Sequence, residues 1–226
     1  MSKTFVWVTR GIYTFFGLVF VGVVAFKVFQ PVQVLPRVRL GPGYWLLDQD
    51  GQRLTNEDMR GTVVLYSFLY TRCPGDCYGI VPTLQRIQAE GPRIMGDIPF
   101  AIVTITLDPE HDTPEVLKAY AQQVGAQPGL WYFATHPDPK RLKLIIGAGF
   151  GVWYEPQPDG SILFAPRYVL VDGWGIVRGD YKYRTLASTQ ERILRHLGVL
   201  VEEIQNSQGS ARLAYEAAHF FLCYAP

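Results

Sequence analysis

The sequence predicts an α/β domain that follows one N-terminal transmembrane helix. Two strand patterns, 62–70 and 99–107, are almost wholly apolar and alternate with helical patterns, which is typical of a sheet with helices on both faces. A long uncharged run occupies the N-terminus. The 226 residues are 48% hydrophobic and only 18% charged, which excludes a disordered chain. The 21 Lys+Arg nearly balance the 20 Asp+Glu, so a general nucleic-acid partner is excluded, since phosphate neutralisation needs a basic excess.

An N-terminal membrane anchor is expected at residues 1–29. The run from Gly11 to Phe26 carries no charge, and it extends to Phe29 if Lys27 snorkels. Its length of about 19 residues then approaches the roughly 20 that a helix needs to cross a bilayer. A cleaved signal peptide is the alternative, but no small-residue cleavage motif follows the run. Residues 30–43 contain three prolines and are expected to form an extended linker.

The remaining elements follow in order within an expected domain at 44–205. The Asp50-Gly51 pair predicts a hairpin with a type I′ turn. Thr113 followed by a proline predicts a helix N-cap. Residues 206–226 are expected to be an amphipathic tail. The other expected elements are strands at 62–70, 99–107 and 131–134, helices at 76–88, 138–146 and 188–205, and a second hairpin at 168–178.

Two cysteines carry the main chemical signal. Cys73 and Cys77 follow the first buried strand and are expected to open the next helix. Residues four apart on a helix share one face, within disulfide reach. The helix dipole and the neighbouring Arg72 favour a thiolate, and two soft sulfurs are also ligands that Cu(I) prefers. The pair can therefore cycle between dithiol and disulfide, bind a soft metal, or both, and two unrelated buried cysteines are the alternative.

Two motifs resemble those of the SCO/SenC proteins. FLYTRCPGDCYGIVPTL, at 68–84, looks like the family's cysteine motif, and LDPEHDTPEVLKAYA, at 107–121, looks like its second signature. The likeness covers roughly residues 41–205. It implies a thioredoxin-like fold on the periplasmic or an equivalent extracytoplasmic side of a membrane, and a role in assembling the copper site of a respiratory oxidase. It also implies copper binding through the two cysteines and a distant histidine, although some members act mainly as thiol reductants.

The sequence departs from this family pattern at the histidine. Alignment on the strand that reads YVLVD places Phe164 at the histidine position, and no histidine lies between His136 and His196. Two thiolates then remain for Cu(I). Pro166 stands before the same strand, where thioredoxin-like oxidoreductases carry a cis-proline facing the cysteines. A cis Pro166 would dock a substrate segment beside Cys73, and a trans proline at a strand start is the alternative.

The other candidate ligands are interpreted mainly as structural. His219 and Cys223 are four apart in the tail and would share a helix face able to present nitrogen and sulfur to a metal, although burial of an amphipathic helix is favoured. The remaining candidates comprise His111 as a surface residue, His136 as a loop residue, His196 as a helix residue, and Asp108, Glu110 and Asp112 as acids at a helix start.

Three functions fit these features. The first is a membrane-anchored SCO/SenC-like protein that assists assembly of an oxidase copper site by thiol–disulfide exchange or Cu(I) transfer, with Cys73 attacking and Cys77 resolving the mixed disulfide. Its expected partners are the membrane and an oxidase subunit or another copper or thiol protein. The second is a general membrane-tethered thiol–disulfide reductase without copper. The third is a non-catalytic subunit of a membrane complex.

Overall fold

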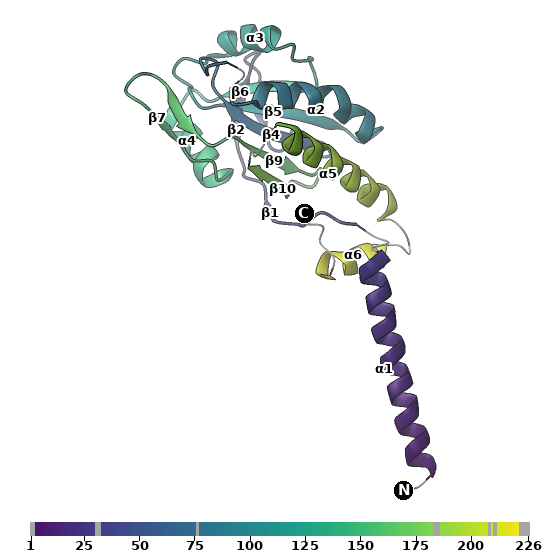
Figure 1. The fold of residues 1–226 in the computed structure, drawn as a ribbon. Helices are drawn as coiled ribbons and strands as arrows, with labels where there is room; N and C mark the ends of the chain where they lie inside the picture. The colour runs from purple at the N-terminus through teal and green to yellow at the C-terminus, as the bar shows by residue number, and fades with distance from the viewer. Residues whose placement is uncertain are drawn as a thin grey trace.

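The structure is a computed structural model that describes residues 3–29, 33–75, 77–182, 186–207, 209 and 212–221. Its described elements form one long N-terminal helix, a mixed α/β domain and a short C-terminal helix (Figure 1). The helices are α1 (Lys3–Phe29), α2 (Ile80–Met95), α3 (Pro114–Gln123), α4 (Pro139–Leu144), the π-helical turn η1 (Ile145–Gly149), α5 (Leu186–Asn206) and α6 (Arg212–Phe221).

The described strands form two sheets. An eight-stranded sheet has the order β1-β10-β9-β4-β5-β6-β2-β3, and a small hairpin pairs β7 with β8. Strands β4, β5 and β6 are parallel, whereas β9 is antiparallel to β4. The strands are β1 (Arg39–Leu40), β2 (Trp45–Asp48), β3 (Arg53–Thr55), β4 (Val63–Leu69), β5 (Phe100–Thr106), β6 (Trp131–Thr135), β7 (Tyr154–Pro156), β8 (Ile162–Phe164), β9 (Arg167–Val171) and β10 (Ile176–Lys182).

Helices cover both faces of the large sheet, as the alternation of elements predicts. On one face α2 and α5 pack side by side, with α2 against β5 and α5 against β10 (Figure 1). On the other face Phe150, which follows η1, contacts Tyr66 and Phe68 of β4 at ring-centroid distances of 4.8 and 5.3 Å. All seven residues of β4 are buried, which explains why its sequence is an uninterrupted apolar run rather than an alternation.

Helix α1 projects away from the domain (Figure 1). Its apolar side chains, such as Trp7, Phe16 and Phe20, are largely exposed. No helix in the described part of the chain, α1 included, combines the length and the hydropathy that a bilayer crossing requires. The transmembrane helix expected within residues 1–29 therefore stays a prediction.

Much of the expected linker is packed on the domain. Val34 and Leu35 are fully buried, and β1 pairs with β10. Arg178 of β10 holds this segment by donating to the carbonyl oxygens of Leu35 (2.8 Å) and Pro36 (3.3 Å). Residues 33–43 therefore behave as an extended edge of the domain rather than as a free tether.

A buried charge cluster supports this packing. The Arg178 guanidinium lies 3.0 Å from Oδ2 of Asp172 and 2.6 Å from Oε2 of Glu203, and all three side chains are buried. Glu203 also accepts from the Leu35 amide and lies 3.1 Å from Nε2 of His219 on α6. The cluster thereby joins the segment before β1, the sheet, α5 and α6, and burial lowers the pKa of His219.

The predicted hairpin at Asp50-Gly51 is present, but its turn type is not the predicted one. Gly51 has a φ of 72°, whereas Asp50 is not in the left-handed region, and a type I′ turn needs both. The Gly51 amide donates to the Asp48 carbonyl oxygen, and the Asp48 carboxylate accepts from the amides of Asp50 and Gln52. The aspartate side chain therefore stabilises a longer turn with glycine at its bulge.

Candidate functional site

Cys73 and Cys77 form a disulfide in the loop between β4 and α2. Their Cα atoms are 5.2 Å apart. Cys77 is 1% exposed, whereas Cys73 is only partly buried. The Cys73 amide donates to the Tyr70 carbonyl oxygen, which closes a tight turn directly after β4. The sulfur of Cys73 is therefore the one that a partner reaches more readily.

The cysteines precede the helix, which corrects the prediction that they open it. Cys77, Tyr78 and Gly79 have φ values of 53°, 57° and 78°, so three successive residues are left-handed and α2 begins only at Ile80. Two of these residues are not glycine, and each costs roughly 1–3 kcal/mol in that region. The disulfide spacing therefore comes from a loop and not from one helical turn, and the helix dipole acts at Ile80 rather than at Cys73.

The second signature motif lies against the cysteine turn. Asp112 is fully buried, and its carboxylate accepts from the Thr71 amide (3.0 Å), the Thr71 hydroxyl and the Thr106 hydroxyl. Parallel pairing of β4 with β5 sets Leu69 beside Thr106, so both strands end at this edge of the sheet. Asp112 thereby fixes the backbone that leads from β4 into Cys73.

Arg72 is engaged with Asp108 of the same motif. Its Nη2 lies 2.5 Å from Oδ2 of Asp108, and its Nε is 3.2 Å from the same atom. Hydrogen bonding to Asp108 raises the pKa of Arg72. The positive charge predicted to favour a Cys73 thiolate is thus shared with a carboxylate. Asp76, which opposes that charge in the sequence, lies outside the described residues.

His111 joins the same cluster. Its Nδ1 lies 3.0 Å from Oδ1 of Asp112 and 3.5 Å from the Thr71 hydroxyl, while 42% of its side chain is exposed. Asp108, His111 and Asp112 offer potential ligand atoms within 4.8 Å of one another. His111 is at the surface, as predicted, but its contact with the cysteine turn was missed. The signal that could have found it is that parallel strands β4 and β5 end at one edge.

Phe164 lies beside the cysteine loop. Its ring makes edge contacts with Tyr78 at 5.6 Å and with Tyr70 at 6.1 Å between centroids. Tyr70 and Phe164 are buried, whereas Tyr78 is about half exposed. The hydroxyl of Tyr70 also accepts from the Ile162 amide of β8. A phenylalanine offers no metal ligand, so this position contributes apolar cover to the loop.

Pro166 directly precedes β9, but its geometry differs from the prediction. The described backbone has no cis peptide bond, so the Ala165–Pro166 bond is trans and the cis expectation is wrong. Pairing of Tyr168 with Ser67 places the start of β9 at the same sheet edge as the end of β4. Pro166 therefore lies at the sheet edge where β4 ends, as predicted, but as a trans proline that precedes a strand.

The other three histidines pack away from the cysteines. His136 lies against Trp45, with ring centroids 4.1 Å apart. Nδ1 of His196 shares a hydrogen bond of 2.8 Å with the Tyr181 hydroxyl. His219 contacts Glu203 in the buried charge cluster. Cys223 lies outside the described residues, so the suggested pair of His219 and Cys223 is untested.

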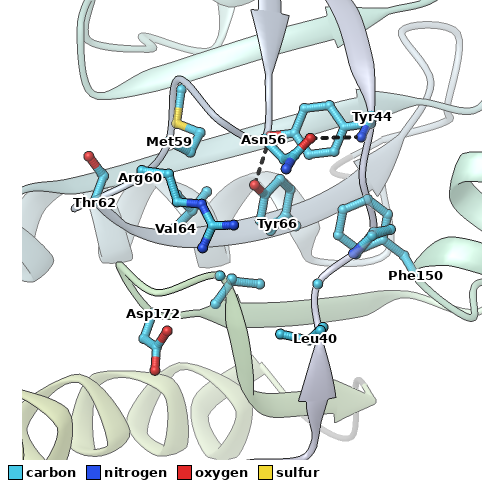
Figure 2. Close-up of a pocket in the computed structure, with 14 residues that line it drawn as sticks. Leu40, Tyr44, Asn56, Met59, Arg60, Thr62, Val64, Tyr66, Phe150 and Asp172 are labelled. Atoms are coloured by element: carbon cyan, nitrogen blue, oxygen red, sulfur yellow. Dashed lines mark hydrogen bonds between the residues drawn. The ribbon is translucent and has the colours of Figure 1, made fainter.

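A pocket of about 100 Å³ is lined in part by Thr62, Val64 and Tyr66, at the end of β4 opposite to the cysteines; Figure 2 shows its lining side chains. Inside it the hydroxyls of Tyr44 and Tyr66 share a hydrogen bond of 2.7 Å, and the Tyr44 amide donates to Asn56. Burial raises the pKa of Tyr44 and raises that of Tyr66 to about 12. The two phenols are neutral at physiological pH, and the described residues that line this pocket include neither Cys73 nor Cys77.

Comparison with known proteins agrees with the fold and the motifs. The model of the SCO1/SenC family matches residues 33–199. A Stutzerimonas stutzeri protein, provisionally named as copper-binding, is 28% identical over 163 residues, which cover 72% of this chain and 79% of that protein. Two solved structures share the fold at 21–22% identity. BsSco, described as a cytochrome c oxidase assembly protein with a disulfide switch, has a TM-score of 0.61 and matches 74% of this chain and 97% of its own. Copper-bound yeast Sco1 has a TM-score of 0.60 and matches 78% and 98%.

Proposed function

Because the chain belongs to the SCO1/SenC family, we propose that it assists the assembly of a respiratory oxidase copper site through Cys73 and Cys77. The observation that carries this proposal is a disulfide in a loop at the end of β4, in which Cys77 is buried and Cys73 is partly exposed. Family relatives are described as copper-binding and as oxidase assembly proteins, which supports the choice of partner.

The thiol chemistry follows from the exposure of the two sulfurs. A thiolate of a partner dithiol attacks Cys73, the Cys73–Cys77 bond breaks, and Cys77 leaves as a thiolate that takes up a proton. The second partner thiolate then attacks the mixed disulfide and releases Cys73. The protein becomes a dithiol and the partner becomes a disulfide. In the opposite direction Cys73 attacks an oxidised oxidase subunit, and Cys77 resolves the mixed disulfide.

The copper chemistry uses the same two residues as cargo ligands. Once reduced, Cys73 and Cys77 offer two soft thiolates, which are suitable ligands for Cu(I). Both residues lie on one short loop, with their Cα atoms 5.2 Å apart, so the two thiolates are close enough to bind one ion. Phe164 adds no ligand, so two-coordinate Cu(I) is the minimum site that these residues support.

We further propose that α1 anchors the domain in a membrane and holds it on the extracytoplasmic side. The support is the uncharged run within α1 and the exposure of its apolar side chains beyond the domain. A disulfide in a short loop also suits an oxidising compartment. Pro166 stays a candidate for contact with the partner's extended segment, since it lies at the sheet edge where the cysteine loop begins.

Phe164 favours a second candidate function, a membrane-tethered thiol–disulfide reductase that handles no copper. An apolar ring at the aligned histidine position covers the loop without binding metal. The two candidates share the exchange chemistry of Cys73 and Cys77. They differ in whether the reduced protein retains Cu(I).

The test uses the full chain in mild detergent, with Cys223→Ser as the background to leave two thiols. The reduced, oxygen-free protein is titrated with Cu(I) against a competing chelator, beside the Cys73→Ser, Cys77→Ser variant. Stoichiometric binding that the variant loses supports copper handling. Equal, weak binding by both proteins refutes it and favours the reductase. Reduction of an oxidised oxidase peptide by the wild-type dithiol, absent in the variant, tests exchange separately.

A further inference from the structure

Helix α6 turns its main polar side chains toward the domain. The Arg37 guanidinium lies 3.1 Å from Oε1 of Glu216. Nε2 of His219 lies 3.1 Å from Oε1 of Glu203, which is itself buried. An amphipathic helix on a water-exposed surface normally does the reverse, with its apolar face on the core and its charges in solvent. The charges of α6 therefore fix the helix on the domain and leave its other side outward.

The outward side of α6 is apolar. Leu213 is 80% exposed, more than any other large apolar side chain in the described part of the chain. In the sequence, Ala217 and Phe220 follow Leu213 by four and seven positions, which is the spacing of one stripe along a helix. The segment FFLCYAP, at 220–226, contains no Asp, Glu, Lys or Arg. We call Leu213, Ala217 and Phe220 the α6 stripe, and such a stripe marks a contact surface.

Helix α6 is held close to the end of α1. Glu203, which contacts His219, also accepts from the Leu35 amide. Leu35 comes six residues after Phe29, where α1 ends, and six residues span at most about 22 Å when fully extended. Figure 1 shows α6 at the end of α1 nearest the domain, running across the direction of α1. A helix in this position lies along the surface of a bilayer that α1 enters.

A lipid surface fits the α6 stripe by its chemistry. Phe16 and Phe20 of α1 are exposed as well, so two neighbouring helices present apolar surface on the same side of the domain edge. The basic side chains of Arg39 and Arg212, close to α6 in the chain or on it, are also exposed and can reach anionic headgroups. Interfacial helices combine an apolar face, basic residues and an orientation along the membrane plane.

We propose that α6 is a lipid-contacting helix, which places its stripe in the headgroup region of the membrane that α1 enters. This inference rests on the proposed anchoring by α1 and adds a second point of contact with lipid. One anchor leaves the domain free to rotate about its connection. A second contact restricts that rotation, so the cysteine loop keeps one orientation toward the membrane.

The test measures the depth of single nitroxide labels in the full-length Cys223→Ser chain, with the Cys73–Cys77 disulfide kept oxidised. Labels are placed at Leu213→Cys on α6, at Phe20→Cys on α1, and at Gln122→Cys as the matched control. Gln122 is an exposed residue of α3, at the end of the domain far from α1 (Figure 1). The protein is placed in nanodiscs of phosphatidylcholine and phosphatidylglycerol. Paramagnetic resonance then compares collisions with oxygen, which enters lipid, and with a nickel chelate, which stays in water.

The label at 213 should show an oxygen-to-nickel ratio several-fold above that at 122, as expected about 5–10 Å inside the headgroup boundary. Equal ratios at 213 and 122, with the label at 20 in lipid, overturn the inference and leave the anchor intact. Labels at 213 and 20 that are both in water overturn the inference and the anchor. Protection of the label at 213 from both reagents also overturns it, because protein, either a second copy or another partner, then covers the stripe.

Discussion

Reduction of the Cys73–Cys77 bond is expected to cost the fold only a small part of its stability. The two cysteines are four positions apart, so the bond closes a very short loop. Chain-entropy reasoning for a loop of about five residues gives a stabilisation of about 2 kcal/mol at 25 °C. Domains of ordinary size have unfolding free energies of about 5–15 kcal/mol, so the dithiol form stays folded. A bond that can open without unfolding the domain suits exchange rather than a structural role.

The assay is urea unfolding of the Cys223→Ser chain in mild detergent, with and without a phosphine reductant. The unfolding free energy should fall by about 2 kcal/mol on reduction, and the melting temperature by about 4–8 °C. The Cys73→Ser, Cys77→Ser variant provides the control, since its stability should not respond to reductant. A loss of more than about 5 kcal/mol, or loss of cooperative unfolding, would refute the reasoning and mark the disulfide as a structural staple.

Three further changes test other parts of the structure. Arg178→Met leaves the buried carboxylates of Asp172 and Glu203 without their cation and should lower the unfolding free energy, measured in urea, by about 3–5 kcal/mol. Arg39→Met, on the exposed edge, should lower it by under about 1 kcal/mol. Equal effects of the two changes would contradict a stabilising role for the buried charge cluster. Burial lowers the pKa of His196 from 6.5 to about 4, so the folded state resists its protonation. Stability is then full above pH 6.5 and is lost as pH falls toward 4, and His196→Gln should show a shallower loss in the same unfolding titration. Thr113→Ala removes the N-cap of α3 and should lower the unfolding free energy by about 1 kcal/mol. An unchanged thermal unfolding curve would disprove this expectation.

The sequence predicted well where one physical signal dominates. The apolar runs at 62–70 and 99–107 became β4 and β5 because strands buried on both faces need no polar alternation. Thr113 caps α3 as expected, since its hydroxyl accepts from the Val116 amide. The two motifs indicate the SCO/SenC family from the sequence alone, and both lie within the residues that the family model matches.

Local backbone geometry at the cysteines was not predictable in the same way. Left-handed Cys77 and Tyr78 run against their intrinsic preference, and the surrounding fold holds them there. A proline before a strand is compatible with either isomer, so nothing in the residues around Pro166 excluded the cis form. Both errors concern conformations that tertiary contacts decide.

The contacts of His111 and Arg178 were missed for a related reason. The Nδ1 atom of His111 contacts the Thr71 hydroxyl across 40 positions of sequence, and Arg178 donates to the Leu35 carbonyl oxygen across 143. Patterns within short windows carry no information on such pairs. The ends of β4 and β5 are the exception, because parallel pairing alone predicts that the loops after them are neighbours.

The packing of residues 33–43 changes how far the domain can range from α1. A free linker of 14 residues would let the domain wander over a root-mean-square distance of about 20 Å. Because Val34 and Leu35 are buried and Arg178 holds their backbone, only residues 30–32 separate α1 from the folded domain. Fully stretched, that connection spans at most about 14 Å. If α1 spans a membrane as proposed above, this short connection keeps the domain close to the lipid surface. Encounters of the cysteine loop with a partner would then depend on lateral diffusion and on the height at which the partner presents its own thiols.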